Sequence, residues 1–242
     1  MSCADAPGRA GSVWAVLAAA GRGERLGLDR PKAFARLRGR PLLAESLERL
    51  ESSGWIDGIV VVAPPGWEEP VILLAEEVGA GKVATAVTGA ASRGESVRNG
   101  VAEVPGEVPV LLVHDAARPV LPEDVIDRLL RTLGEGFDGA VPALPVADTV
   151  KRLRDGEVVE TIDRKSLVAA QTPQAFLADP LRDALSGDIS KATDCAALVE
   201  ARGGRVKAVP GDRRLMKVTQ PGDLDLVEAL LEPVDQRSPT PR

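Results

Sequence analysis

The chain has 242 residues, with 30 basic and 36 acidic side chains and a formal net charge of −6. This charge excludes a global attraction to nucleic acid, and three Phe, three Trp and no Tyr leave few platforms for stacking bases. No uncharged apolar run is long enough to cross a membrane, and the N-terminal residues lack a signal-peptide core, so we expect a cytoplasmic protein. Two cysteines and one histidine make neither a disulfide framework nor a zinc site.

Short apolar runs alternate along the chain with segments that carry apolar residues at helical spacing. This alternation is typical of an α/β fold that is Rossmann-like, with a mainly parallel sheet and helices on both faces. We expect a single domain over residues 13–231, between a flexible tail at 1–12 and a disordered tail at 232–242. The expected strands are 13–17, 58–63, 82–88, 108–113, 139–143, 205–209 and 215–218. The expected helices are 41–50, 68–78, 93–104, 122–133, 176–185, 193–201 and 222–231.

The first predicted strand is followed by a glycine loop, residues 18–32, that is rich in cationic side chains. A glycine-rich backbone can approach an anion and turn its N–H groups toward it, while Arg and Lys neutralise charge, so this loop predicts a polyphosphate site. A dinucleotide fingerprint is not met, because Gly27 comes one position late, and no Walker A sequence is present. A solvated surface loop is the alternative. The cationic residues are Arg22, Arg25, Arg30 and Lys32.

The α/β alternation is interrupted near Val146. Two β-rich runs, 146–150 and 158–162, flank Asp155-Gly156, a dipeptide typical of a hairpin turn. An isolated two-stranded ribbon is marginally stable in water, so we expect this arm, at about 145–170, to dock on another surface. The residues alone leave both a second subunit and a local flap open.

His114 and Asp115 follow the predicted strand at 108–113. In open parallel sheets, ligands sit beyond the carboxyl ends of the strands, where Asp115 would emerge. A carboxylate beside a triphosphate needs a cation between them, and Mg²⁺ takes one or two carboxylates plus phosphate oxygens. Asp115 is therefore a predicted Mg²⁺ ligand, with capping of the following turn as the alternative. We expect His114 to be a packed side chain.

Residues 89–96 end a predicted strand and open a predicted helix. Small residues, hydroxyl groups and a helix N-terminus suit a contact with a base, a ribose or a phosphate. Ser92 and Glu95 equally fit a capping box, which needs no ligand.

Several motifs in chain order resemble the 2-C-methyl-D-erythritol 4-phosphate cytidylyltransferases, the third-step enzymes of non-mevalonate isoprenoid synthesis. The resemblance covers residues 13–231. The sequence departs from the family pattern at Ala18, at Cys195 and in the 89–92 loop, and the last of these departures leaves the detail of base recognition open. The motifs are Leu17-Ala18-Ala19-Ala20-Gly21-Arg22-Gly23-Glu24-Arg25, Pro31-Lys32, Arg93-Gly94-Glu95-Ser96-Val97, His114-Asp115-Ala116-Ala117-Arg118-Pro119, Asp148-Thr149, Asp163-Arg164, Gln171-Thr172-Pro173-Gln174, Thr193-Asp194 and Lys217-Val218-Thr219.

The resemblance implies transfer of CMP from CTP to the sugar phosphate, with Mg²⁺ held by Asp115. It makes Arg25 and Lys32 the stabilisers of the transition state, and Arg164 and Lys217 the catalytic residues that place the acceptor. Implied CTP-binding residues are Ala19, Ala20, Gly21, Gly23, Arg25, Lys32, Gly89, Ala90, Ser96, Asp115 and Ala116. Implied acceptor-binding residues are Arg118, Asp148, Thr149, Arg164, Thr193 and Lys217.

The resemblance also implies a homodimer in which the arm crosses over, so that Thr149 and Arg164 complete the site of the other subunit. Its partners are then small molecules and a second copy, with no nucleic acid and no membrane. A phosphomonoester is mostly a dianion near neutral pH, so the reaction needs no general base. Two alternatives remain: a ribitol 5-phosphate cytidylyltransferase and a nucleotide-binding regulatory protein without turnover.

Overall fold

The computed structural model describes residues 11–189 and 192–231. Except for Gly11 and Ser12, the two predicted tails lie outside these residues. In the described part, eight strands form a sheet. Seven of them lie in the order β10-β7-β11-β6-β1-β4-β5, and the eighth, β12, pairs with β7. These strands are β1 (Val13–Ala18), β4 (Gly58–Ala63), β5 (Val83–Thr88), β6 (Val110–Asp115), β7 (Gly139–Pro145), β10 (Val168–Ala170), β11 (Gln174–Leu177) and β12 (Val206–Pro210).

The sheet is mainly parallel, as predicted. Strand β1 pairs in parallel with β4 and β6, β4 with β5, and β7 with β12. Strand β11 runs antiparallel to β6 and β7, and β10 antiparallel to β7. The predicted α/β class is therefore confirmed, with antiparallel strands on one side of the sheet.

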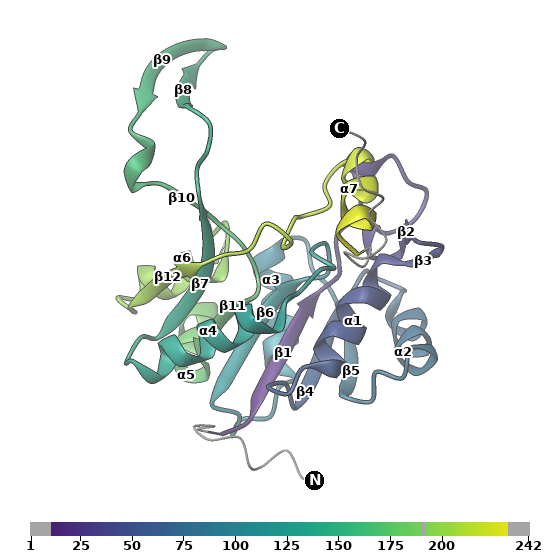
Figure 1. Ribbon diagram of the computed structural model, residues 1–242. Coiled ribbons are helices and arrows are strands. Elements are labelled where there is room, and N and C mark those ends of the chain that lie inside the picture. The colour runs from purple at the N-terminus through teal and green to yellow at the C-terminus, as the bar shows by residue number, and fades with distance from the viewer. Residues whose placement is uncertain (1–10, 190–191, 232–242) are drawn as a thin grey trace, which may run out of the picture.

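Helices cover both faces of the sheet (Figure 1). Successive side chains of a strand point to opposite faces, and in β1 Ala15 and Leu17 join one core cluster while Val16 joins the other. Because both faces are buried, the strands are almost continuously apolar. The first face carries α1 (Leu42–Ser52), α2 (Glu68–Glu77) and α4 (Glu123–Gly134), and the second carries α3 (Arg93–Ala102), α5 (Ala178–Ser186) and α6 (Cys195–Ala201).

A third apolar cluster, called here the α7 cluster, lies beside the glycine loop. Helix α7 (Gly222–Leu231) lies next to β2 (Arg36–Leu37) and β3 (Arg40–Pro41) in Figure 1. The buried members of the cluster are Leu26, Ala35, Leu37, Leu42, Val120, Val218 and Val227. No helix in the described part of the chain is both long enough and apolar enough to span a bilayer.

The hairpin arm projects from the body of the molecule (Figure 1). Its strands are β8 (Val150–Arg154) and β9 (Glu157–Ile162), joined by Asp155 and Gly156 with φ angles of 51° and 85°. Positive φ at both turn residues is what a type I′ hairpin turn requires. The predicted hairpin is confirmed, but its first strand was placed four residues too early, at 146–150.

Two other predictions need correction. The helix predicted at 176–185 is present as α5, but it begins at Ala178. Phe176 and Leu177 end strand β11 instead, where Phe176 pairs with Leu111 on one side and Gly139 on the other. The predicted strand at 215–218 is irregular, because its backbone groups bond to a loop and a side chain instead of a strand. The Val218 N–H donates to the Ala117 carbonyl, and the Leu215 carbonyl accepts from Arg118.

Candidate active site

The glycine loop and Asp115 meet at the carboxyl edge of the sheet. Asp115, the last residue of β6, is paired with Ala18, the last residue of β1. From β1 the chain adds β4 and then β5 on one side of β1 in the sheet. The next strand, β6, is added on the opposite side of β1, so the strand order reverses between β1 and β6. This is the position at which open α/β sheets bind ligands.

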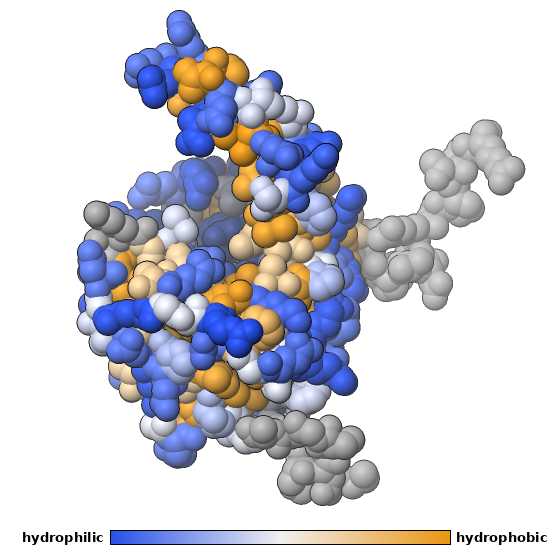
Figure 2. Space-filling model, turned by 90° about the vertical axis from the view of Figure 1, so that its left-hand side faces the viewer, coloured by the Kyte–Doolittle hydropathy of each residue, from blue (hydrophilic) through white to orange (hydrophobic). Residues whose placement is uncertain are grey.

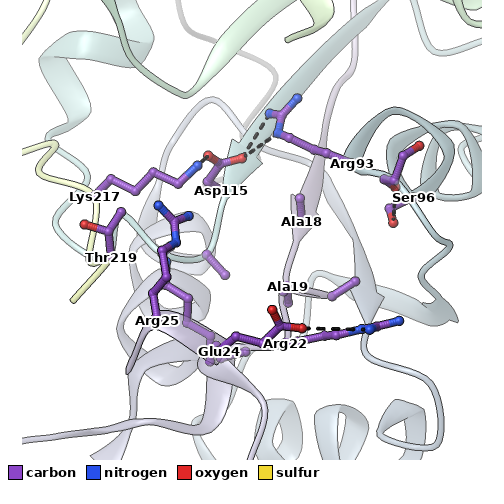
Figure 3. A pocket seen from close by; sticks show the side chains of 18 of the residues that line it. Ala18, Ala19, Arg22, Glu24, Arg25, Arg93, Ser96, Asp115, Lys217 and Thr219 are labelled. Carbon is purple, nitrogen blue, oxygen red and sulfur yellow. Dashed lines mark hydrogen bonds and ion pairs between the residues drawn. The ribbon is translucent and has the colours of Figure 1, made fainter. Parts of the chain in front are cut away.

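A cavity of about 490 Å³ opens at this edge. Its lining comes from the glycine loop, the 90–96 segment at the start of α3, the end of β6 and the segment that leads to α7 (Figure 3). The predicted site residues that line it are Ala19, Ala20, Gly21, Gly23, Arg25, Lys32, Ala90, Ser96, Asp115, Ala116 and Lys217.

Gly23 allows the glycine loop to fold back on itself. Its φ of 78° favours glycine, and an added Cβ would lie 3.1 Å from the Lys32 backbone nitrogen. The Lys32 N–H donates to the Gly21 carbonyl at 3.2 Å and closes the loop. Lys32 therefore faces the same cavity as residues ten positions earlier in the chain.

Five cationic side chains line this cavity: Arg22, Arg25, Lys32, Arg93 and Lys217. Burial, together with the nearby charges of Lys217 and Arg25, lowers the pKa of Lys32 to about 8. Figure 3 shows the Arg25 side chain reaching toward Lys217 and Asp115. Because these cations repel one another across a small space, an anion with several charges would relieve the repulsion.

Asp115 stands between two cations (Figure 3). Its Oδ1 lies 2.9 Å from Arg93 Nη2, and its Oδ2 accepts a hydrogen bond from Lys217 Nζ at 2.7 Å. Burial alone would raise the pKa of this carboxyl, but Arg93 and Lys217 outweigh burial and hold it below its ordinary value. The carboxylate is therefore ionised at neutral pH.

Arg93 belongs to the motif Arg93-Gly94-Glu95-Ser96-Val97, but no role was predicted for it. It is the first residue of α3, lines the cavity, and places Nη1 3.8 Å from the Sγ atom of Cys195. Burial raises the pKa of the Cys195 thiol to about 11, so the thiol is neutral. The sequence signal that could have indicated a role for Arg93 was its position directly after Ser92, the predicted N-cap of the helix. Thr219 and Ser92 also line the cavity without having been predicted as ligands.

The 89–96 segment is shaped by its own hydrogen bonds. Ser92 and Glu95 form the capping box that was one of the two interpretations. The Ser96 hydroxyl donates to the Ser92 carbonyl at 2.8 Å and accepts from the Ala90 N–H at 2.9 Å. Gly89 does not line the cavity, and an added Cβ at this position would come 2.2 Å from the Ala20 Cβ. The close contact of Gly89 with Ala20 joins two loops of the site.

His114 is a packed residue, as predicted. Its side chain is fully buried, with Nδ1 3.2 Å from the Thr172 hydroxyl and Nε2 3.1 Å from the Arg118 carbonyl. Because the Asp115 N–H donates to the Thr172 hydroxyl, that hydroxyl can donate to Nδ1, which leaves the proton on Nε2. Burial lowers the pKa of His114 to about 4, so the ring is neutral and braces the loop around Asp115.

The sequence profile of the 2-C-methyl-D-erythritol 4-phosphate cytidylyltransferase family matches residues 13–233. The chain belongs to this family. A relative of that name from Nocardia farcinica is 44% identical over 223 residues, or 92% of this chain and 95% of the relative. Another, from Frankia casuarinae, is 43% identical over 224 residues, or 92% of this chain and 82% of the relative.

Solved structures agree with this assignment to the cytidylyltransferase family. A crystal structure of a 4-diphosphocytidyl-2C-methyl-D-erythritol synthase matches with a TM-score of 0.77 and 34% identity, over 91% of this chain and 99% of that one. The cytidylyltransferase from Thermus thermophilus matches with a TM-score of 0.72 and 32% identity, over 89% of this chain and 96% of that one.

Most of the acceptor-binding residues that the family resemblance implied lie outside the cavity. Arg118 donates to the Leu215 carbonyl, and Thr193 is exposed near the start of α6. Asp148, Thr149 and Arg164 lie on the exposed arm, where Arg164 donates to the Ala147 carbonyl. Lys217 alone of the implied acceptor residues lines the cavity of its own chain. The roles of all six in acceptor binding stay predictions.

The family resemblance also implied a metal ion. In residues 11–189 and 192–231, no group of three or more His, Cys, Asp or Glu side chains is arranged to hold one. A single carboxylate fits Mg²⁺, because this ion is commonly held by one or two carboxylates together with substrate phosphates. The donor set around Asp115 is thus compatible with Mg²⁺ that arrives with a nucleotide.

Proposed function

We propose that this chain transfers CMP from CTP to 2-C-methyl-D-erythritol 4-phosphate, which gives 4-diphosphocytidyl-2-C-methyl-D-erythritol and pyrophosphate. The observation that carries the proposal is the convergence of Arg25, Lys32 and Lys217 on one cavity behind a glycine loop. Membership of the cytidylyltransferase family supports the choice of nucleotide and acceptor.

The reaction is a substitution at phosphorus. An oxygen of the acceptor phosphate attacks the α-phosphorus of CTP, and the bond from this phosphorus to the oxygen that bridges to the β-phosphate breaks. A phosphomonoester has a second pKa of about 6 and is already a nucleophilic dianion at neutral pH. A general base is therefore unnecessary, in agreement with a buried, neutral His114.

The protein has to bring two anions together and stabilise the charge that develops. Arg25 and Lys32 are placed to stabilise the triphosphate and the departing pyrophosphate, because both belong to the glycine loop and line the cavity. Lys217 enters from another segment and is placed to attract the acceptor phosphate. Fixed cations in a partly enclosed site act without reorganisation during the reaction, which is how electrostatic catalysis gains its strength.

Mg²⁺ is part of the proposal, with Asp115 as its protein ligand. When bound, the ion would neutralise charge on the phosphate oxygens of CTP. Arg93 contacts one Asp115 oxygen and Lys217 the other, so a metal ion held by Asp115 would compete for Oδ2 with Lys217. Its side chain is 38% exposed and flexible, whereas Arg93 is anchored at the start of a helix.

A homodimer formed through the arm is also proposed. The arm exposes large apolar side chains, with Leu153 61% and Val158 60% exposed, and Figure 2 shows hydrophobic surface on it. Apolar surface on a projecting ribbon is expected where another chain docks. Thr149 and Arg164 would then reach the site of the other subunit. A cytoplasmic location belongs to the same proposal.

The deciding experiment incubates the purified protein with CTP and Mg²⁺ and measures released pyrophosphate. Release is expected with 2-C-methyl-D-erythritol 4-phosphate and not with ribitol 5-phosphate. Preference for ribitol 5-phosphate would support the rival cytidylyltransferase. CTP binding without pyrophosphate from either acceptor would support a regulatory protein.

A further inference from the structure

Two of the cationic residues of the site, Arg25 and Lys217, are each followed directly by a buried apolar residue, called here an anchor. Arg25 precedes Leu26, which is 5% exposed, and Lys217 precedes Val218, which is fully buried. Both anchors belong to the α7 cluster, where helix α7 contributes the fully buried Val227. The glycine loop and the segment that carries Lys217 therefore pack on one helix, although they are far apart in the chain.

Polar contacts fix the Lys217 segment to α7. One carboxylate oxygen of Asp223, Oδ2, accepts hydrogen bonds from the Thr219 N–H at 2.7 Å, the Thr219 hydroxyl at 2.7 Å and the Gln220 N–H at 3.0 Å. On the other side, the Val218 N–H donates to the Ala117 carbonyl at 2.8 Å. Lys217 thus lies directly before a stretch that is held both to the Asp115 loop and to α7.

The same helix contacts the chain that follows Lys32. The Arg38 N–H donates to Glu228 Oε1 at 2.9 Å, and Arg38 Nη2 donates to the Glu228 carbonyl at 3.2 Å. Arg38 has a φ of 52°, an unusual conformation for a residue with a side chain, and α7 supports it there. The two segments that carry triphosphate-binding cations and the one that carries Lys217 are all secured on α7 (Figure 1).

We propose that helix α7 is a positioning element that fixes Lys217 relative to Arg25 and Lys32, with Asp223 and Val227 as its positioning residues. The inference rests on the proposed function, in which these cations hold two different substrates. In-line attack depends on the relative placement of the two phosphates, and a displacement of about 1 Å can cost roughly 10²-fold in rate. Neither positioning residue lines the cavity.

Full-length Val227→Ala and Asp223→Asn variants test this inference, with Leu226→Ala as the matched control. Leu226 lies on the same helix and is 57% exposed. We expect Val227→Ala and Asp223→Asn to lower kcat by roughly tenfold or more, while the KM for either substrate changes by less than about threefold. The control should match the wild type. Circular dichroism and thermal unfolding establish the folded fraction of each variant.

An unchanged kcat in folded Val227→Ala and Asp223→Asn would overturn the inference, as would a loss that only follows the folded fraction. If Val227→Ala does not fold, Asp223→Asn decides, because it keeps the side-chain volume and removes the charge that accepts three hydrogen bonds. A wild-type protein without turnover would refute the proposed function instead. Turnover in the wild type with unchanged variants would refute this inference alone.

Discussion

The guanidinium of Arg93, at the start of α3, lies 2.9 Å from the carboxylate of Asp115, at the end of β6. Their side chains are 27% and 9% exposed, so water screens this ion pair weakly. Lys217 contacts the other oxygen of the same carboxylate at 2.7 Å. Asp115 thus pairs with two cations, Arg93 from the first turn of a helix and Lys217 from an irregular segment.

Removal of Arg93 should destabilise the protein and the site together. We expect Arg93→Gln to lower the free energy of unfolding by about 2 kcal/mol, less than the ~3–5 kcal/mol of a fully buried pair, because Lys217 remains. Turnover should fall with it, since Asp115 loses its fixed orientation. Urea unfolding and pyrophosphate release measure the two effects. Arg98→Gln, an exposed substitution on the same helix, is the control, and equal behaviour of both variants would contradict the role of Arg93.

Arg25 and Lys32 should matter for turnover more than for folding. We expect Arg25→Ala or Lys32→Ala to lower kcat by roughly 10²-fold or more, as for the loss of a preorganised charge donor, with the fold intact. Steady-state pyrophosphate release and circular dichroism provide the two measurements. Arg30→Ala is a suitable control, because Arg30 pairs with Asp29 and does not line the cavity. Normal turnover in either variant would refute the assignment.

The pKa of Lys32 predicts a pH dependence for nucleotide binding. With a pKa of about 8 in the free protein, Lys32 loses its charge as the pH rises through 8, whereas a bound triphosphate favours the charged form. CTP affinity should therefore decline from pH 7.5 to 9.5, and binding should take up protons in that range. Calorimetry in two buffers of different ionisation enthalpy, with a chelator present, measures this uptake.

Lys32→Arg is the control for the pH dependence. A guanidinium stays protonated throughout this range, so the variant should bind CTP with little change in affinity between pH 7.5 and 9.5. If the wild type and Lys32→Arg show the same pH profile, another group is responsible.

Gly89 should be intolerant of a side chain although it does not line the cavity. A Cβ at this position would lie 2.2 Å from the Ala20 Cβ, so Gly89→Ala has to separate two loops of the site. We expect a loss of about 1–3 kcal/mol in unfolding free energy and a higher KM for CTP. Chemical unfolding and initial rates measure these effects. Gly54→Ala meets nothing within 4 Å and should be nearly neutral; similar results for both glycines would show that the loop contact is dispensable.

The local pattern of the sequence predicted those elements that local patterns determine. The strand at 58–63 and the helix at 222–231 have the predicted bounds, because a β-branched run and a helical period specify them without help from the rest of the chain. The glycine loop and Asp115 were predicted for the same reason, since both follow apolar strands directly.

The errors concern residues whose structure depends on distant partners. Phe176 is in a strand because β6 and β7 leave a place between them, and Gly139 provides room for its ring. The first arm strand follows from the turn: a two-residue loop at Asp155-Gly156 pairs Arg154 with Glu157 and sets the register. Arg93 was missed because its partner, Asp115, is 22 residues away and meets it only in the folded chain.

The arm raises the question of which subunit uses Arg164. On the homodimer proposal, Arg164→Ala damages the site of the other subunit, whereas Lys32→Ala damages the site of its own. A mixed dimer of the two variants would then contain one site with both defects and one site with neither. We expect it to regain up to about half of the wild-type activity, although each parent dimer is impaired. Differently tagged subunits, purified in tandem, make the composition of the dimer certain. Loss of activity in verified mixed dimers would instead place Arg164 in the site of its own chain, as expected for a local flap.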